Sequence, residues 1–322
     1  MRQLIRLLAA ACAALAFSAS AADSYPSQPV RLIVGYAPGG STDVFARALA
    51  AKLTERWKKE VIVDNKPGAS EIVGASAVAG AKPDGYTLLV STDQALLSNQ
   101  FLFTKLGYSP TKSFVPVIRA MDAPMVLVVR AGSPYQNVAQ LVEAAKKDPG
   151  KINYSSNGPG GHIHLALNWL GVKAGVKFTH VPYKGGGPAI QAVLANEVDM
   201  TTVPLSVADA FLKANSLRAL AVTSPKRIPA LATVPSLTEL GYDVDVQALS
   251  AIVAPAETPP AIVNKIADDV RAIVTDPAFA AREIDRYGFF VIGDDPRQFA
   301  DYLTKAASGY RARITAANVT LD

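Results

Sequence analysis

The chain has 322 residues, of which 50% are hydrophobic and 18% are charged, so it is long and apolar enough to bury a large core. Its formal net charge is +5, charges of both signs are scattered evenly and aromatic residues make up 7%, which argues against a nucleic-acid-binding protein built on one basic stripe. Beyond residue 22 there is no run of about 18 apolar residues, which excludes a protein built on several membrane-spanning helices. The length predicts about two domains.

Residues 1–22 have the composition of a secretory signal peptide. Arg2 and Arg6 precede an apolar stretch, which ends in small residues that suit cleavage. The alternatives are an N-terminal anchor helix and a lipoprotein modified at Cys12. Because Cys12 is the single cysteine, the processed chain would contain no disulfide, no thiolate metal site and no cysteine nucleophile. We therefore expect an exported, periplasmic protein.

Strand-like and helix-like segments alternate along the rest of the chain, which is typical of an α/β protein with largely parallel sheets. The expected strands span residues 30–34, 61–63, 86–90, 152–155, 178–181, 198–203 and 217–222. The expected helices span residues 42–57, 72–81, 162–170, 188–196, 261–275, 277–287 and 296–317.

Two longer extended segments, residues 114–129 and 244–254, differ from this pattern. Their positions suit a chain that crosses twice between two domains. This arrangement predicts a discontinuous first domain, residues 23–122 plus 250–322, and a second domain, residues 123–249. The alternative is two consecutive domains joined by one linker.

Loops rich in Gly, Pro and Ser follow several expected strands and precede helices. They span residues 35–43, 64–70, 91–94, 155–162 and 182–187. In parallel sheets such loops lie at the carboxyl ends of the strands, where ligands bind. A helix start offers unpaired N–H groups and a partial positive charge, and glycine lets a ligand approach the backbone. The loops therefore predict a cleft for a carboxylate or a phosphate, although Ser41 by itself is equally explained as a helix cap.

Motifs of common enzymes are missing from the sequence. There is no P-loop, no G-x-G-x-x-G and no G-x-S-x-G nucleophile elbow. Two of the three histidines, His162 and His164, are two residues apart and would face different directions on a helix, so they do not share a metal. We expect no catalytic residue, no metal and no cofactor. A serine hydrolase that uses His164 with a loop serine is the alternative of another class.

Short motifs in a set order carry a resemblance to a known family. They are Pro38-Gly39-Gly40 with Asp43, Asn65-Lys66-Pro67-Gly68, Lys82-Pro83-Asp84-Gly85-Tyr86, Asn153-Tyr154-Ser155-Ser156 and His180-Val181-Pro182-Tyr183-Lys184-Gly185. In this order they are similar to the Bug-type solute-binding receptors of tripartite tricarboxylate transporters. The resemblance implies an α/β, two-domain periplasmic binding protein of type II, a Venus flytrap with two crossover strands as its hinge.

The resemblance also implies a function and partners. It implies binding of a small carboxylate in the interdomain cleft and its delivery to a permease of one large and one small integral membrane subunit. We therefore expect a monomeric, non-enzymatic binding protein with a small carboxylate ligand, permease subunits as partners and no nucleic acid. A subunit that presents its ligand to a periplasmic sensor system is the alternative within this fold.

By position, the resemblance places the ligand carboxylate on the loop of residues 38–43, with donors of the second domain opposite. The residues expected to bind the ligand are Pro38, Gly39, Gly40, Ser41, Thr42, Asp43, Asn65, Gly68, Ala69, Ser91, Thr92, Ser155, Asn157, Gly158, Gly160, Gly161, Tyr183, Lys184, Gly185 and Asp199. Ser70-Glu71 stands where the family usually has Gly-Gly. Glu71 either supports a helix start or, like Asp93, pairs with an amine or hydroxyl of the ligand. An acidic residue in the cleft disfavours a polyanion such as citrate.

Overall fold

The computed structural model describes residues 25–319 except residue 69, together with residue 321, so the expected signal peptide and Cys12 lie outside the described residues. Within this part of the chain the strands are β1 (Val30–Val34), β2 (Val61–Asn65), β3 (Thr87–Ser91), β4 (Phe114–Arg130), β5 (Asn153–Ser156), β6 (Thr179–Pro182), β7 (Met200–Pro204), β8 (Leu217–Val222), β9 (Gln247–Pro255) and β10 (Phe290–Val291). The helices are α2 (Ser41–Trp57), α3 (Ile72–Ala79), α4 (Asn99–Leu102), α5 (Val138–Lys147), α6 (His162–Ala174), α7 (Gly186–Leu194), α8 (Leu205–Lys213), α9 (Pro260–Val274), α10 (Pro277–Glu283) and α11 (Pro296–Ala317). Shorter turns are η1 (Gln94–Ser98), η2 (Pro229–Leu231) and η3 (Asp285–Tyr287).

The strands form one sheet that runs through the whole molecule. Its order is β2-β1-β3-β9-β4-β7-β5-β6, and β8 and β10 also pair with β4. β1 pairs in parallel with β2 and β3, and β5 pairs in parallel with β6 and β7. The central strands β4 and β9 are antiparallel to each other and to their neighbours. The predicted α/β class with parallel units is therefore confirmed.

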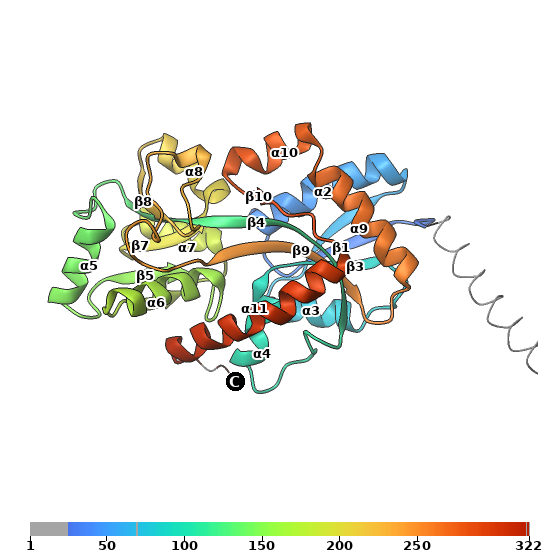
Figure 1. Ribbon diagram of the computed structural model, residues 1–322, viewed down its shortest axis with the longest axis horizontal. Coiled ribbons are helices and arrows are strands. Elements are labelled where there is room, and N and C mark those ends of the chain that lie inside the picture. The colour runs from blue at the N-terminus through green and yellow to red at the C-terminus, as the bar shows by residue number, and fades with distance from the viewer. Residues whose placement is uncertain (1–24, 69, 320, 322) are drawn as a thin grey trace, which may run out of the picture.

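Two strands, β4 and β9, join the halves of this sheet (Figure 1). β4 pairs with β9 as far as Pro124 and with β7 and β8 beyond it. We call the described residues of 25–124 and 247–321 the first lobe, and residues 125–246 the second lobe. The domain boundaries predicted from the sequence fall inside β4 and β9 and remain a prediction.

The helix α2 shows how the sequence pattern builds the core. Phe45, Leu49 and Leu53 lie one turn apart and are buried, and Trp57 continues the same face. Burying one such side chain contributes about 1.5–3 kcal/mol to stability. The indole N–H of Trp57 donates to Asp269 Oδ2 at 2.6 Å, which fixes α2 to α9. These four residues form the buried apolar face of α2.

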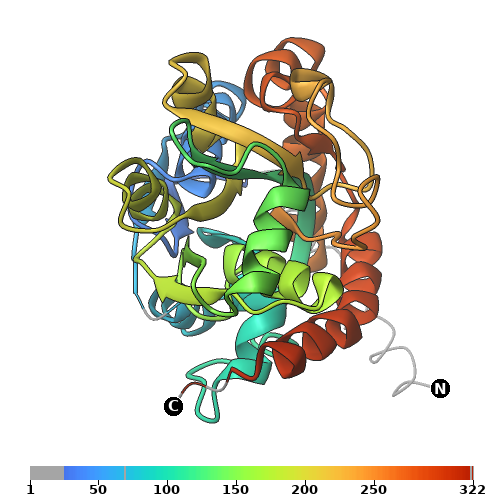
Figure 2. The same ribbon diagram turned by 90° about the vertical axis from the view of Figure 1, so that its left-hand side faces the viewer.

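The long helix α11 has the bounds predicted from the sequence. Asp295 and Gln298 form a capping box at its start, and Pro296 suits the first helical position. Figures 1 and 2 show α11, drawn in red, along the outer side of the molecule. It contacts η1 of the first lobe and α6 of the second lobe, so it packs against both.

Three helices were not predicted from the sequence, namely α4, α5 and α8. In α5 the buried residues Val138, Leu141, Val142 and Ala145 have helical spacing, so the signal was present. α8 follows β7 without a loop, and α4 is a single turn, so neither has a clear boundary in the sequence. α10 is shorter than predicted because its last turn is the separate 3-10 turn η3.

Candidate functional site

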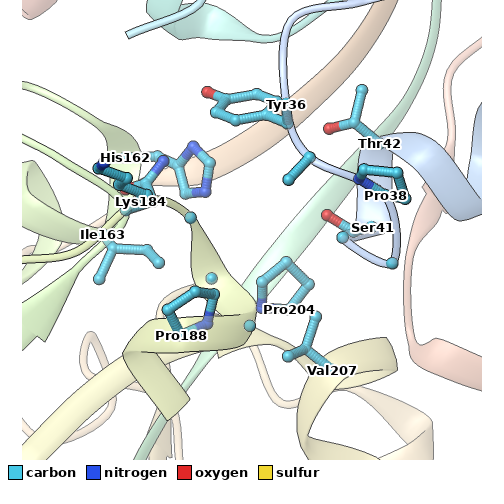
Figure 3. A pocket seen from close by; sticks show the side chains of 17 residues that line it. Tyr36, Pro38, Ser41, Thr42, His162, Ile163, Lys184, Pro188, Pro204 and Val207 are labelled. Atoms are coloured by element: carbon cyan, nitrogen blue, oxygen red, sulfur yellow. The ribbon is translucent and has the colours of Figure 1, made fainter. Parts of the chain in front are cut away.

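A cavity of about 130 Å³ lies between the two lobes, where β1, β5, β6 and β7 end (Figure 3). Residues of both lobes line it. The first lobe contributes Tyr36, Ala37, Pro38, Gly39, Gly40, Ser41 and Thr42. The second lobe contributes Asn157, His162, Ile163, Lys184, Gly185, Gly186, Gly187, Pro188, Pro204 and Val207. Loops at the carboxyl ends of parallel strands thus meet around one cavity.

Three helices begin at this cavity, and each is preceded by a glycine. α2 follows Gly40, α6 follows Gly161 and α7 follows Gly185, and none of these N-caps has a side-chain hydrogen bond to its helix. The first bond back to each cap carbonyl is donated by the residue four positions later. The N–H groups in between have no partner inside the helix and carry the positive end of the helix dipole. The arrangement is suited to holding an anion from several sides.

Lys184 adds a full positive charge to the same cavity. Its side chain is exposed and, among the described residues, it forms no ion pair. In Figure 3 it lies beside His162, opposite Tyr36, Ser41 and Thr42 of the first lobe. A lysine beside helix starts is a common way to hold a carboxylate or a phosphate.

A second cavity, of about 640 Å³, adjoins the first. The two share Tyr36, Ala37, Asn157, Lys184 and Gly185 in their linings. The other residues that line the second cavity are Gly35, Pro67, Gly68, Ser70, Glu71, Gly158, Pro159, Pro182 and Tyr183. The cleft therefore leads from the three helix starts to Glu71.

Glu71 is the only carboxylate among the described residues that line either cavity, and it is 1% exposed. Its Oε2 accepts from Thr92 Oγ1 at 2.8 Å and from the Ala95 N–H at 3.1 Å, whereas Oε1 has no hydrogen-bond partner in the described part of the chain. Burial is the main cause that raises the pKa of Glu71 to about 7. The hydrogen bonds from Thr92 and Ala95 oppose this rise, and the nearby charge of Asp93 adds to it.

Asp43 does not line a cavity but supports the loop that does. Its Oδ2 accepts from the Gly39 N–H at 3.0 Å and from Arg47 Nε at 3.1 Å, and its Oδ1 accepts from Asn65 Nδ2 at 2.9 Å. Burial alone would raise the pKa of Asp43, but these hydrogen bonds outweigh it and hold the pKa below its ordinary value. Asn65 also donates to the Tyr36 carbonyl. Asp43 and Asn65, predicted as ligand contacts, are therefore placed behind the loop.

Eleven predicted contacts line one or both cavities: Pro38, Gly39, Gly40, Ser41, Thr42, Gly68, Asn157, Gly158, Tyr183, Lys184 and Gly185. Eight predicted contacts lie behind the residues that line the cavities, namely Asp43, Asn65, Ser91, Thr92, Ser155, Gly160, Gly161 and Asp199. Their polar groups are used within the fold, since Ser155 Oγ donates to the Ala189 carbonyl at 2.7 Å and Asp199 Oδ2 accepts from the Asn153 N–H at 2.8 Å. Ala69 lies outside the described residues.

Several lining residues were not predicted as ligand contacts, namely Tyr36, Ala37, His162, Ile163, Gly186, Gly187, Pro188, Pro204 and Val207. Most of them stand next to predicted residues at a helix start, so their position was a usable signal. Val207 belongs to α8, which was not predicted. Asp93, considered as an alternative ligand contact, lies outside both linings and is fully buried.

Two histidines of the second lobe stack on each other, with the ring centroids of His164 and His180 3.9 Å apart. Burial, with a further effect of His180, lowers the pKa of His164 to about 3, and burial lowers the pKa of His180 to about 4. His164 Nδ1 accepts from the Gly160 N–H at 2.9 Å, and no serine of the described chain bonds to His164. Ser156 Oγ lies 2.6 Å from His180 Nε2, but Ser156 is buried and outside both cavities. This geometry does not assemble a hydrolase on His164.

Within residues 25–319 and 321, apart from residue 69, no group of three or more His, Cys, Asp or Glu side chains is placed to hold a metal ion. The helices of the same residues include none that is long and apolar enough to cross a membrane.

Comparison with known proteins gives the family. The family model described as tripartite tricarboxylate transporter family receptor matches residues 45–318. Protein BugT of Bordetella pertussis is 33% identical over 267 residues, which cover 81% of this chain and 82% of BugT. A relative from Cupriavidus necator is 34% identical over 305 residues, which cover 91% of this chain and 90% of the relative.

Solved structures agree with this assignment. The periplasmic binding protein BugD is 31% identical with a TM-score of 0.85, and the match covers 92% of this chain and 99% of BugD. A Rhodopseudomonas palustris protein determined with adipate is 29% identical with a TM-score of 0.88, covering 92% and 99% of the two chains. MatC from the same organism, with bound malate, is 26% identical with a TM-score of 0.84, covering 90% and 100%. The predicted periplasmic binding protein fold is thus confirmed, and the chain belongs to the tripartite tricarboxylate transporter receptor family of Bug-type periplasmic solute-binding proteins.

Proposed function

We propose that the protein binds a small carboxylate in the cleft between its lobes and delivers it, in the periplasm, to the membrane permease of a tripartite tricarboxylate transporter. The observation that carries the proposal is the convergence of three glycine-capped helix starts on one cavity, with Lys184 beside them. The structural neighbours with adipate and malate support a carboxylate as the ligand class. The permease as partner rests on the description of the family.

The donors of the cavity are sufficient for useful affinity. A hydrogen bond to a charged group contributes about 1.5–3 kcal/mol net. Three or four of them, after association costs of several kcal/mol, give a binding free energy of about −8 kcal/mol, which corresponds to a micromolar dissociation constant. No covalent step is needed, so the ligand leaves the site unchanged.

A ligand bound by both lobes produces a closed form, which the permease can distinguish from the open form. The carboxylate docks first on residues 38–42 of the first lobe, and motion about β4 and β9 then brings Lys184 and the helix starts of the second lobe onto it. A ligand that bridges both lobes favours the closed form by its differential affinity for the two forms. A monomer is sufficient for this mechanism.

The test is calorimetry of the purified, processed protein with a panel of monocarboxylates and dicarboxylates that includes adipate and malate. Lys184→Ala is expected to weaken binding by about tenfold or more, because it removes one charged hydrogen bond. Lys226→Ala is the matched control, since Lys226 is exposed in the second lobe and lines neither cavity. Absence of binding for the whole panel, or equal affinities of the two variants, would contradict the proposal.

A further inference from the structure

Three acceptor groups that line the second cavity have capacity that the fold does not use. Glu71 Oε1 and Asn157 Oδ1 are buried and have no hydrogen-bond partner in the described part of the chain. The Tyr36 hydroxyl lies 3.2 Å from Thr92 Oγ1. Because the single hydroxyl proton of Thr92 is donated to Glu71, Tyr36 is the donor in this contact and its oxygen can still accept. These three groups can therefore accept hydrogen bonds from a ligand.

The charges around Glu71 point the same way. Its side-chain partners are the Thr92 hydroxyl and the Ala95 N–H, and no described Lys, Arg or His is paired with it. The charge that acts on Glu71 is that of Asp93, which raises its pKa, and Glu71 in turn raises the pKa of Tyr36 and Tyr108. None of these groups is a cation. Lys184 lines the same cavity but, within the described part of the chain, it forms no ion pair with Glu71 or with any other acid. A buried carboxylate without a cation is costly, so a positively charged ligand group would offset this cost.

The backbone makes room for this carboxylate. Glu71 and the preceding Ser70 both have a left-handed conformation, with φ of 69° and 54°, which carries a cost for residues other than glycine. A Cβ on Gly35 would lie 2.8 Å from Glu71 Cγ, and a Cβ on Gly74 would lie 2.9 Å from the Gly35 Cα. The absence of side chains at Gly35 and Gly74 is what allows Glu71 to turn inward. A loop of the second lobe lies next to this segment, since a Cβ on Gly158 would lie 3.7 Å from Ser70 Oγ.

We propose that the ligand of this protein is a zwitterion of the amino-acid class, with its carboxylate at the helix starts of the first cavity and its ammonium group on Glu71, Asn157 and Tyr36 in the second. An ammonium group has three donors, which match these three acceptors. The inference rests on the proposed function, because it takes the carboxylate site beside Lys184 as given. A second carboxylate at the same place would meet the charge of Glu71 instead.

The test compares ligand pairs that differ only in the ammonium group: aspartate with succinate, and 4-aminobutyrate with butyrate. In at least one pair the wild-type protein is expected to bind the amine-bearing member about tenfold more tightly, as one hydrogen-bonded charge pair would give. Glu71→Gln keeps the size of the side chain and is expected to bring the ratio of the two dissociation constants close to one. Glu60→Gln is the matched control, because Glu60 is exposed and lines neither cavity.

A second measurement needs no variant. With the pKa of Glu71 raised to about 7, part of the free protein carries a proton on Glu71 at pH 7. An ammonium ligand displaces this proton, so calorimetry in buffers of different ionisation enthalpy is expected to report proton release on binding of the amine-bearing ligand. The amine-free partner is expected to release none.

The outcomes separate the two proposals. Binding of amine-free acids as tight as that of their partners, or a preference that survives in Glu71→Gln, overturns the zwitterion and leaves the carboxylate receptor in place. Absence of binding for both members of both pairs and for the wider carboxylate panel overturns the carboxylate receptor itself.

Discussion

The carboxylate of Asp93 and the imidazole of His162 meet across the boundary between the lobes, with Oδ1 3.4 Å from Nδ1. Asp93 precedes η1 of the first lobe, is fully buried and has no hydrogen-bond partner for either oxygen among the described residues. His162 is the first residue of α6 and lines the first cavity. The distance between the two side chains therefore depends on how closely the lobes approach each other.

We expect Asp93→Asn and His162→Asn each to lower ligand affinity by about fivefold, because each removes the charge attraction of about 1 kcal/mol that this pair gives the closed form when the imidazole is protonated. In the double variant the loss should be no larger than in the stronger single variant, since both substitutions remove the same contact. Calorimetry with one carboxylate on all four proteins checks this cycle. Losses that simply add would show that the two residues act separately.

Gly160 sets how closely the lobes approach at a second point. It has a φ of 71°, and a Cβ at this position would overlap the Leu102 side chain of the first lobe. We expect Gly160→Ala to cost the closed form about 1–3 kcal/mol by overpacking, which lowers ligand affinity by about tenfold or more.

A matched control for Gly160→Ala lies at the other end of α6. Gly175 has a similar φ of 65°, but a Cβ there has no neighbour within 4 Å. Gly175→Ala therefore introduces the backbone strain without the interlobe clash. It should lower the free energy of unfolding and leave affinity unchanged. Calorimetry measures the affinity of both variants and urea titration measures their free energy of unfolding. Equal affinities of Gly160→Ala and Gly175→Ala would show that the contact with Leu102 is irrelevant to closure.

Asp43 is expected to act on binding through the loop that it supports. Asp43→Ala removes the acceptor of the Gly39 N–H and the partner of Asn65, so residues 38–42 lose their anchor. We expect affinity to fall by about tenfold and the free energy of unfolding to fall by about 1–3 kcal/mol. Arg47→Ala should have a smaller effect on affinity and on the free energy of unfolding. The Arg47 side chain is half-exposed, and its removal leaves the hydrogen bonds of Asp43 with Gly39 and Asn65 in place. Calorimetry and urea titration measure the two effects, and unchanged affinity of Asp43→Ala would contradict this role.

The loops around the cleft were predictable because they depend on local sequence. Strand–glycine–helix junctions identified the edge of the sheet, and parallel pairing then placed residues 38–42 opposite Lys184 and Gly185. Glycine at three helix starts was visible in the sequence, since each glycine is followed by residues of helical pattern. The general location of the cleft therefore followed from rules of α/β topology.

Which side chains turn inward could not be predicted in the same way. Asp43 and Glu71 are both acids near the start of a helix, and only distant partners distinguish them. Asp43 is bonded by Asn65, which the parallel register of β1 and β2 brings beside Val34. Glu71 turns inward because Gly35, across a loop and a strand, leaves space for it. Such relationships depend on packing between elements rather than on the local pattern.

The stacked histidines predict a stability that depends on pH. The pKa of His164 is about 3 in the folded protein because of burial and the adjacent His180, and about 6.5 in an unfolded chain. As pH falls below about 6.5 the unfolded chain takes up the proton first, so the contribution of His164 to stability is complete above that pH and is lost progressively towards pH 3.

His164→Asn isolates this effect, because the Asn Oδ1 can replace Nδ1 as the acceptor of the Gly160 N–H. We expect the free energy of unfolding of the wild type, relative to the variant, to fall by about 1.4 kcal/mol per pH unit between about pH 6 and pH 4. Glu71 and Asp122, whose pKa values burial raises to about 7 and about 6, shift stability in the opposite direction. Both are present in both proteins, so their effects cancel in the difference. Urea titrations at several pH values measure the difference in the free energy of unfolding between the wild type and His164→Asn. If this difference does not change with pH, His164 takes up its proton as readily in the folded protein as in the unfolded chain.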